Sequence, residues 1–139
     1  MERIVVGVDG SEAAHGALQW AVDEARRRNA VVEAIHAWHQ PFVSGYAYLG
    51  EIDLGPYVTE AEAVLEGAIA SVDTTGVTVE HKVMAGGPAQ VLVEQAKGAA
   101  MLVVGSRGRG GFTGLMLGSV SQQVAHHSPC PIVIIPPAS

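Results

Sequence analysis

Five short apolar runs alternate along this chain with segments of helical periodicity, and this alternation constrains the fold more than any other feature. The runs are rich in Val and Ile, and the segments between them carry small apolar residues that can approach a sheet closely. The pattern predicts a single α/β domain spanning residues 1–139, with one doubly wound parallel sheet and helices on both faces. The expected strands are Ile4–Val8, Val31–Trp38, Val77–Met84, Met101–Val104 and Ile132–Ile135.

Start and stop signals mark four helices between the strands. Ser11 is a candidate N-cap for the first helix, which ends in Arg26–Arg28. These cations suit a helix C-terminus better than a nucleic-acid patch. Thr59 and Glu62 form a capping box for the second helix. The third is expected from Pro88 until Gly98, and the fourth from about Ser119 to His126.

The turns that follow the first and fourth strands are chemically the richest in the chain. Asp9 stands in the first turn, and a glycine-rich stretch begins at Gly105 in the other. Ligands of doubly wound sheets bind at the carboxyl ends of the strands where the strand order reverses. If the two strands are neighbours, both turns line one cleft, which predicts the order 3-2-1-4-5. Strand Ile132–Ile135 then lies at an edge, and we expect it to pair with its copy in a homodimer.

The stretch from Gly105 to Ser119 reads GSRGRGGFTGLMLGS and predicts a phosphate-binding loop. Glycines leave backbone N–H groups uncovered and permit positive φ, so that several donors can converge on one anion. A helix that begins at Gly118–Ser119 would add its free N–H groups and the positive end of its dipole. The stretch is neither a P-loop, since no Lys follows the glycines, nor a dinucleotide fingerprint, since Thr113 replaces the third glycine.

Charge is distributed unevenly along the chain. The net charge of -6 argues against a nucleic acid or an acidic membrane as the main partner. All fourteen acidic residues lie at or before Glu94, and the rest of the chain holds only Lys97, Arg107 and Arg109 as charged residues. An anion is therefore favoured near the glycines, although solvated loop arginines are the alternative explanation. No targeting segment or membrane-spanning stretch is evident, so we expect a cytoplasmic protein.

Several short motifs along the whole chain match the pattern of one protein family. They are Ile4-Val-Val-Gly-Val-Asp9-Gly-Ser11, Ala34-Ile-His-Ala37, Val103-Val-Gly-Ser-Arg-Gly108, the spacing Gly105-x2-Gly108-x9-Gly118-Ser119, and the ending Val124-Ala-His-His-Ser-Pro-Cys-Pro-Ile-Val. Together they resemble the universal stress protein family, and the intact glycine set resembles its ATP-binding branch. One departure is Ala100, where the family often has an acid just before the fourth strand.

The resemblance implies a Rossmann-like domain, usually dimeric through the last strand, that binds ATP, with Mg as the expected metal partner of the nucleotide. Asp9 would contact the adenosine end, and the Ala37 backbone would contact adenine. Ribose and phosphates would be held by the glycine set, with three further residues completing the expected site. These residues are Gly105, Arg107, Gly108, Gly118, Ser119, Val120 and Ser121.

Several of these residues also have purely structural interpretations. Asp9 can cap the following helix, although Ser11 is better placed to do so, and Ser119 can be an N-cap. His126 and His127 are adjacent on a helix and lack a third ligand at suitable spacing, so we expect no metal site in the protein itself. His36 is expected to be an interior histidine with a hydrogen-bond partner, and Cys130 a buried hydrophobe.

Three functions remain open at this level. The favoured one is a nucleotide-binding stress-response or signalling module with slow or no ATP hydrolysis, acting through its dimer or through the long connection of residues 39–57. The second is an ATPase or nucleotidyl-transfer enzyme, for which the chain offers no second acid near the phosphate end. The third is a structural, chaperone-like dimer with a vestigial pocket. We expect no catalytic residue, and the sequence leaves open which adenine nucleotide is bound.

Overall fold

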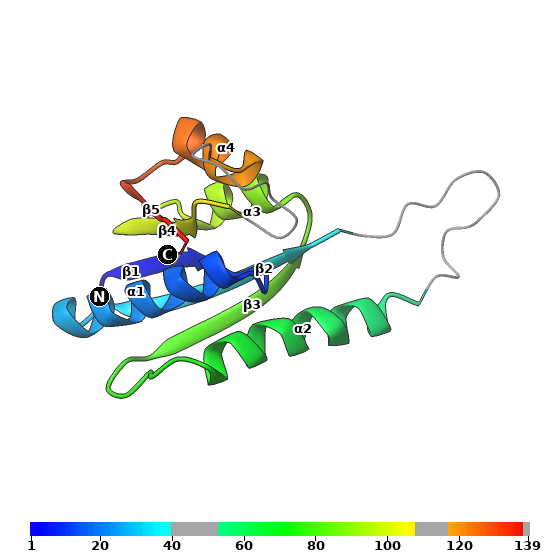
Figure 1. The fold of residues 1–139 in the computed structure, drawn as a ribbon, viewed down its shortest axis with the longest axis horizontal. Helices are drawn as coiled ribbons and strands as arrows, with labels where there is room; N and C mark the ends of the chain where they lie inside the picture. The colour runs from blue at the N-terminus through cyan, green and yellow to red at the C-terminus, as the bar shows by residue number, and fades with distance from the viewer. Residues whose placement is uncertain (40–52, 108–116, 138–139) are drawn as a thin grey trace.

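A parallel sheet of five strands forms the centre of the computed structural model, which describes residues 1–39, 53–107 and 117–137 (Figure 1). The strand order is β3-β2-β1-β4-β5, as the sequence predicts, so the order reverses between β1 and β4. The strands are β1 Arg3–Gly7, β2 Val31–Trp38, β3 Val79–Ala85, β4 Met101–Gly105 and β5 Ile132–Ile135. The helices are α1 Glu12–Arg28, α2 Gly55–Ala70, α3 Pro88–Gln95 and α4 Ser119–His127.

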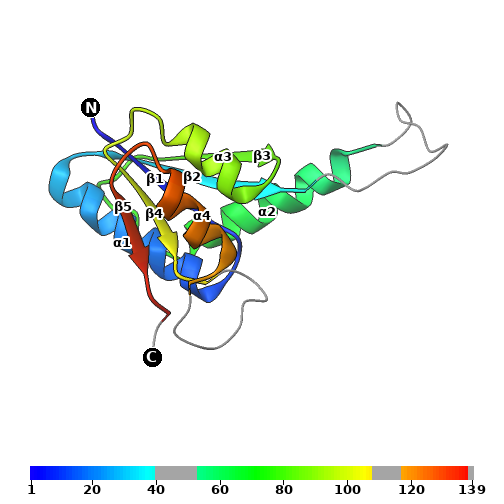
Figure 2. The ribbon, with the colours of Figure 1, turned by 90° about the horizontal axis from the view of Figure 1, so that it is seen from above.

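Two helices cover each face of the sheet (Figures 1 and 2). Alternation along β1 explains the two layers, because successive side chains of a strand point to opposite faces. Ile4 and Val6 pack with Leu18 of α1 and Leu65 of α2, while Val5 packs under α3 and α4. All of these side chains are fully buried. No helix in the described part of the chain is long and apolar enough to span a membrane.

The element bounds agree with the predicted ones to within about two residues except in α2 and α3. The predicted capping box of Thr59 and Glu62 is wrong, because α2 begins at Gly55 and Thr59 lies inside the helix. Pro56 near the helix start favours helical φ there, and Asp53 Oδ1 accepts the Gly55 N–H at 2.9 Å. Helix α3 ends at Gln95, three residues before the glycine expected to stop it. Most of the connection 39–57 lies outside the described residues.

Candidate functional site

A cleft opens at the carboxyl ends of β1 and β4, where the strand order reverses. The two turns singled out in the sequence line it together, as predicted. The lining residues come from all three layers of the fold. They are Gly7, Val8, Asp9, Ala14, Ile35, Ala37, Pro88, Leu92, Val104, Gly105, Arg107, Val120 and Ser121.

Asp9 stands directly beyond β1 and is held by the turn it belongs to. Its Oδ1 accepts the Ser11 N–H at 2.9 Å. The Ser11 hydroxyl oxygen in turn accepts the Ala14 N–H at 3.1 Å, which makes Ser11 the N-cap of α1. Ser11, not Asp9, therefore caps this helix, and the Asp9 carboxylate is positioned at the cleft by its bond to the turn.

Gly105 has a packing reason to be glycine. A Cβ built at Gly105 would lie 2.8 Å from the Cβ of Ala13 and 2.9 Å from its carbonyl carbon. Helix α1 therefore approaches β4 too closely for any side chain. The expected use of positive φ is wrong at both described glycines of the loop, since Gly105 lies outside the left-handed region and Gly118 has a φ of -69°.

A hydrogen-bonded clasp joins the end of β4 to the start of α4. The carbonyl oxygen of Ser106 accepts the Gly118 N–H at 2.7 Å. The Ser121 hydroxyl donates towards the carbonyl oxygens of Ser106 and Gly118, each 2.9 Å away. The Ser106 N–H donates to Ile135 of β5 at 2.8 Å. The Gly118 N–H and the buried Ser121 hydroxyl thus bond within the protein and tie α4 to the end of β4.

The first turn of α4 brings backbone donors to this cleft. Its N-cap is Gly118, and no side chain of the described residues caps it, in contrast to α1 with Ser11. Ser119 is the first helical residue, so the interpretation of Ser119 as an N-cap is wrong. The first N–H groups of a helix have no intrahelical partner, and the dipole makes this end attractive to anions. Val120 and Ser121 of this turn line the cleft.

The structure brings most of the predicted residues together. Asp9, Ala37, Gly105, Arg107, Val120 and Ser121 line the cleft, and Gly118 and Ser119 adjoin it at the start of α4. Gly108 and Arg109 lie outside the described residues. Sequence reasoning missed the apolar wall that Leu92 and Pro88 of α3 contribute. The glycine at position 7 of β1 could have indicated that a side chain packs closely there, because a Cβ at Gly7 would lie 2.7 Å from Cδ1 of Leu92.

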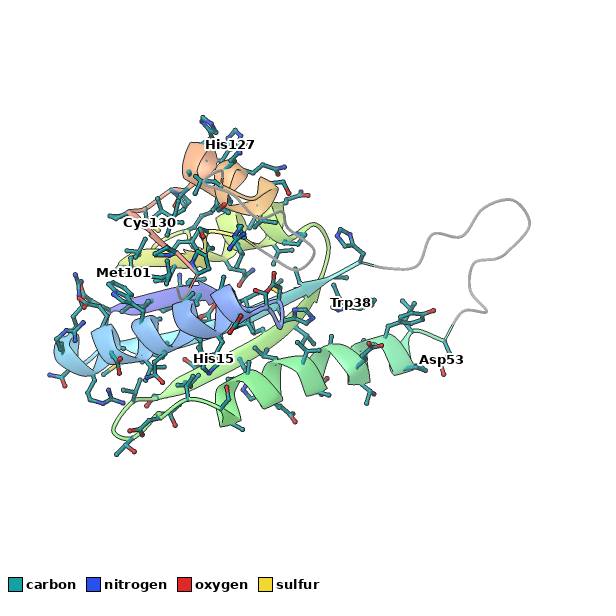
Figure 3. All side chains as sticks on the ribbon, viewed as in Figure 1. His15, Trp38, Asp53, Met101, His127 and Cys130 are labelled. Atoms are coloured by element: carbon teal, nitrogen blue, oxygen red, sulfur yellow. The ribbon has the colours of Figure 1, made fainter. Side chains whose placement is uncertain are left out.

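The remaining polar candidates have local partners. His36 Nδ1 lies 2.7 Å from the Val8 carbonyl oxygen, as expected for an interior histidine. His127 points away from the sheet at the outer end of α4 (Figure 3), and no group of His, Cys, Asp or Glu suited to a metal occurs among the described residues. Cys130 is half-buried, with its Sγ 3.7 Å from the Ser128 hydroxyl.

The arginines at the end of α1 pair within the protein. Arg28 and Arg27 donate to the two carboxylate oxygens of Glu24, both at 2.7 Å. These hydrogen bonds lower the pKa of Glu24, with the bond from Arg28 as the largest cause. Arg26 donates to the backbone carbonyls of Asp73 and Thr75. The helix-end interpretation of these cations is confirmed.

Comparison with known proteins shows the family of the chain. The model of the universal stress protein family matches residues 1–136. A universal stress protein of Mycolicibacterium smegmatis is 38% identical over 141 residues, which cover 96% of this chain and 45% of the relative. One from Mycobacterium tuberculosis H37Rv is 38% identical over 133 residues, which cover 94% of this chain and 44% of the relative.

A solved structure has the same architecture. It is a universal stress protein in complex with cAMP, with a TM-score of 0.73 and 28% sequence identity, and the match covers 96% of this chain and 95% of that one. This chain therefore spans nearly the whole of the solved relative but less than half the length of the two mycobacterial ones. On sequence and architecture together, the chain belongs to the universal stress protein family.

Proposed function

We propose that this chain binds an adenine nucleotide, ATP accompanied by Mg, in the cleft between the β1 and β4 turns. It acts as a cytoplasmic stress-response or signalling module whose state follows nucleotide occupancy, with slow or no hydrolysis. The observation that carries the proposal is the first turn of α4, which lacks a side-chain cap and adjoins a cleft that also contains Asp9. The cAMP complex of the solved relative supports an adenine nucleotide as the ligand class.

The residues of the cleft fit the parts of such a ligand. The N–H groups at the start of α4 and the Arg107 guanidinium suit phosphate oxygens. The Asp9 carboxylate can accept from ribose hydroxyls. The apolar side chains of Ile35, Leu92 and Val104 provide a surface for a flat base.

The backbone of Ala37 is turned the right way to recognise a base. The carbonyl of Ile35 points towards β1, because it accepts the Val8 N–H at 2.8 Å. Backbone groups two residues apart in a strand point to the same side. The N–H and carbonyl of Ala37 therefore point to the β1 side of β2. They lie beyond the last β1–β2 pair, Gly7 with Ile35, and Ala37 itself lines the cleft.

Binding is favoured over turnover by the distribution of acids. Phosphoryl transfer relies on metal ligands and on a group that orients the nucleophile. Asp9 is the only carboxylate that lines the described cleft, and the chain has no acid after Glu94. Mg would then be held mainly by phosphate oxygens and water. A steady ATP turnover well above about one per second, the lower end of ordinary enzyme rates, contradicts this part of the proposal.

The proposal includes a homodimer through Ile132–Ile135. Strand β5 lies at an edge of the sheet, and its four apolar residues are each only half-buried. Pairing with a second β5 would satisfy the open backbone groups and cover these side chains. Light scattering should give twice the chain mass, and Ile134→Lys should give the single mass.

Calorimetric titration with ATP, ADP and AMP, with and without Mg, tests the binding proposal. Ser119→Asp places an acid at the start of α4, where it favours the helix dipole but repels phosphates. Ser119→Asn is the matched neutral control. We expect Ser119→Asp to weaken ATP binding by about tenfold relative to Ser119→Asn, and AMP binding by less. No binding by the wild type, or equal affinities of the two variants, contradicts the proposal.

A further inference from the structure

The ladder between β1 and β2 stops one step short of what regular pairing would give. Its last pair is Gly7 with Ile35, and the Val8 N–H still donates to the Ile35 carbonyl at 2.8 Å. In a parallel ladder, a residue bonds to the two residues that flank its partner on the next strand. The next bond of a regular ladder would therefore run from the Ala37 N–H to the Val8 carbonyl.

A side chain takes the place of that bond. His36 Nδ1 lies 2.7 Å from the Val8 carbonyl oxygen, and no backbone N–H of the described residues donates to this oxygen. A carbonyl oxygen can only accept, so Nδ1 must carry the hydrogen. His36 is half-buried, and its register partner on β3 is Val83.

This bond acts on the residue that follows. The Val8 carbonyl belongs to the planar peptide that also contains the Asp9 nitrogen, so holding its oxygen fixes how the chain leaves β1. The Val8 side chain is only 3% exposed, which anchors the other side of the same peptide. Asp9 then bonds to the Ser11 N–H, and α1 begins. His36 thus holds one end of a short turn whose other end is the Ser11 cap.

We infer that His36 is a positioning residue of the cleft: its ring replaces one bond of the β1–β2 ladder, fixes the peptide that carries Asp9, and leaves the Ala37 amide directed at the ligand. The inference rests on the proposed function, because Asp9 and Ala37 matter only if a nucleotide binds there. It assigns the effect to the adenosine end of the ligand. AMP and ATP must therefore respond alike, unlike the response expected at Ser119.

The test uses three substitutions in the full chain. His36→Phe keeps a planar ring but removes the donor, and His36→Asn restores a donor at the place of Nδ1. His81→Phe makes the same change at an exposed histidine of the edge strand β3. Calorimetry gives the Kd of AMP and ATP, and urea unfolding shows that each variant is folded.

We expect His36→Phe to raise both Kd values equally by about three- to tenfold, the effect of about one hydrogen bond. His36→Asn should bind within about twofold of the wild type, and His81→Phe should bind like the wild type. Wild-type affinity in His36→Phe overturns the inference. So does a loss in His36→Asn as large as that in His36→Phe, because restoring the donor would then have no effect.

A measurement without ligand separates this inference from the proposed function. In the free protein, NMR of the imidazole nitrogens should show a hydrogen on Nδ1 of His36, and the Asp9 amide signal should move in His36→Phe but little in His36→Asn. If the wild type binds no nucleotide, the proposed function fails and these spectra still decide whether His36 holds the turn. A hydrogen on Nε2 alone overturns the inference whatever the affinities are.

Discussion

Replacing Gly105 by alanine tests whether packing or ligand contact requires a glycine at the end of β4. The new Cβ would lie 2.8 Å from the Cβ of Ala13 and 2.9 Å from its carbonyl carbon. Carbon atoms in contact rest at about 3.5–4.0 Å, so α1 and β4 must separate by about 0.7 Å or more. The obstacle includes backbone, which cannot rotate away as a long side chain can.

Overpacking of this kind costs about 1–3 kcal/mol of the free energy of unfolding. With a urea m-value of about 2 kcal/mol/M, a loss of about 2 kcal/mol lowers the unfolding midpoint by about 1 M. Gly67→Ala is the matched control, because a Cβ at this position in α2 meets nothing within 4 Å. It should raise the free energy of unfolding by about 0.5–1 kcal/mol, since alanine is the better helix residue.

Chemical unfolding followed by circular dichroism measures both variants, and calorimetry measures their ATP binding. The packing argument is refuted if Gly105→Ala unfolds at the same urea concentration as the wild type. If it does so and yet loses ATP, Gly105 is required for the ligand alone. If it is destabilised and binding falls in proportion to the folded fraction, packing is the whole explanation.

Three further changes test other contacts of the structure. Ser11→Ala removes the cap of α1 and should cost about 1 kcal/mol in urea unfolding, and an unchanged midpoint would exclude a capping role. Ser121→Ala removes the hydroxyl of the β4–α4 clasp and should cost about 1 kcal/mol and weaken ATP binding, whereas a loss of affinity without loss of stability would point to direct ligand contact. The pKa of Glu24 is lowered in the folded protein by Arg28 and then Arg27, so the stability this residue contributes is present above its unfolded pKa and is lost as pH falls through the folded pKa. Urea midpoints of Glu24→Gln should therefore depend less on pH in the acid range than those of the wild type, and equal pH dependence would contradict the assignment.

The strand order was predictable because two turns with predicted ligand-binding residues have to lie next to each other to form one site. Asp9 and the glycines from Gly105 onward can share a site only if β1 and β4 are neighbours, and they are. The start of α2 was not predicted, because two start signals compete in this sequence. Thr59 and Glu62 match a capping box, but Pro56 and Asp53 come first in the chain and set the helix start.

Most of the polar and glycine residues of the cleft were predictable, but some of the contacts they make within the protein were not. The spacing of glycines in a sequence does not show whether their bare backbone faces a ligand or a helix. At Gly105 the close approach of α1 is sufficient to require a glycine. The hydroxyl of Ser121 and the N–H of Gly118 bond to the carbonyl oxygen of Ser106, a residue to which the sequence analysis assigned no role. Leu92 was missed because its place at the cleft depends on how α3 crosses β1.

The two edges of the sheet differ in character, and the difference bears on the size of the homodimer proposed above. On β3 the exposed residues Glu80, His81 and Lys82 make a hydrated border that resists pairing, whereas β5 presents four apolar residues in a row. In the proposed dimer, pairing of β5 with β5 would cover the apolar edge of each sheet and leave the charged β3 edge at both ends of the joined sheet. Strand pairing would then end at two subunits instead of extending the sheet into a fibre.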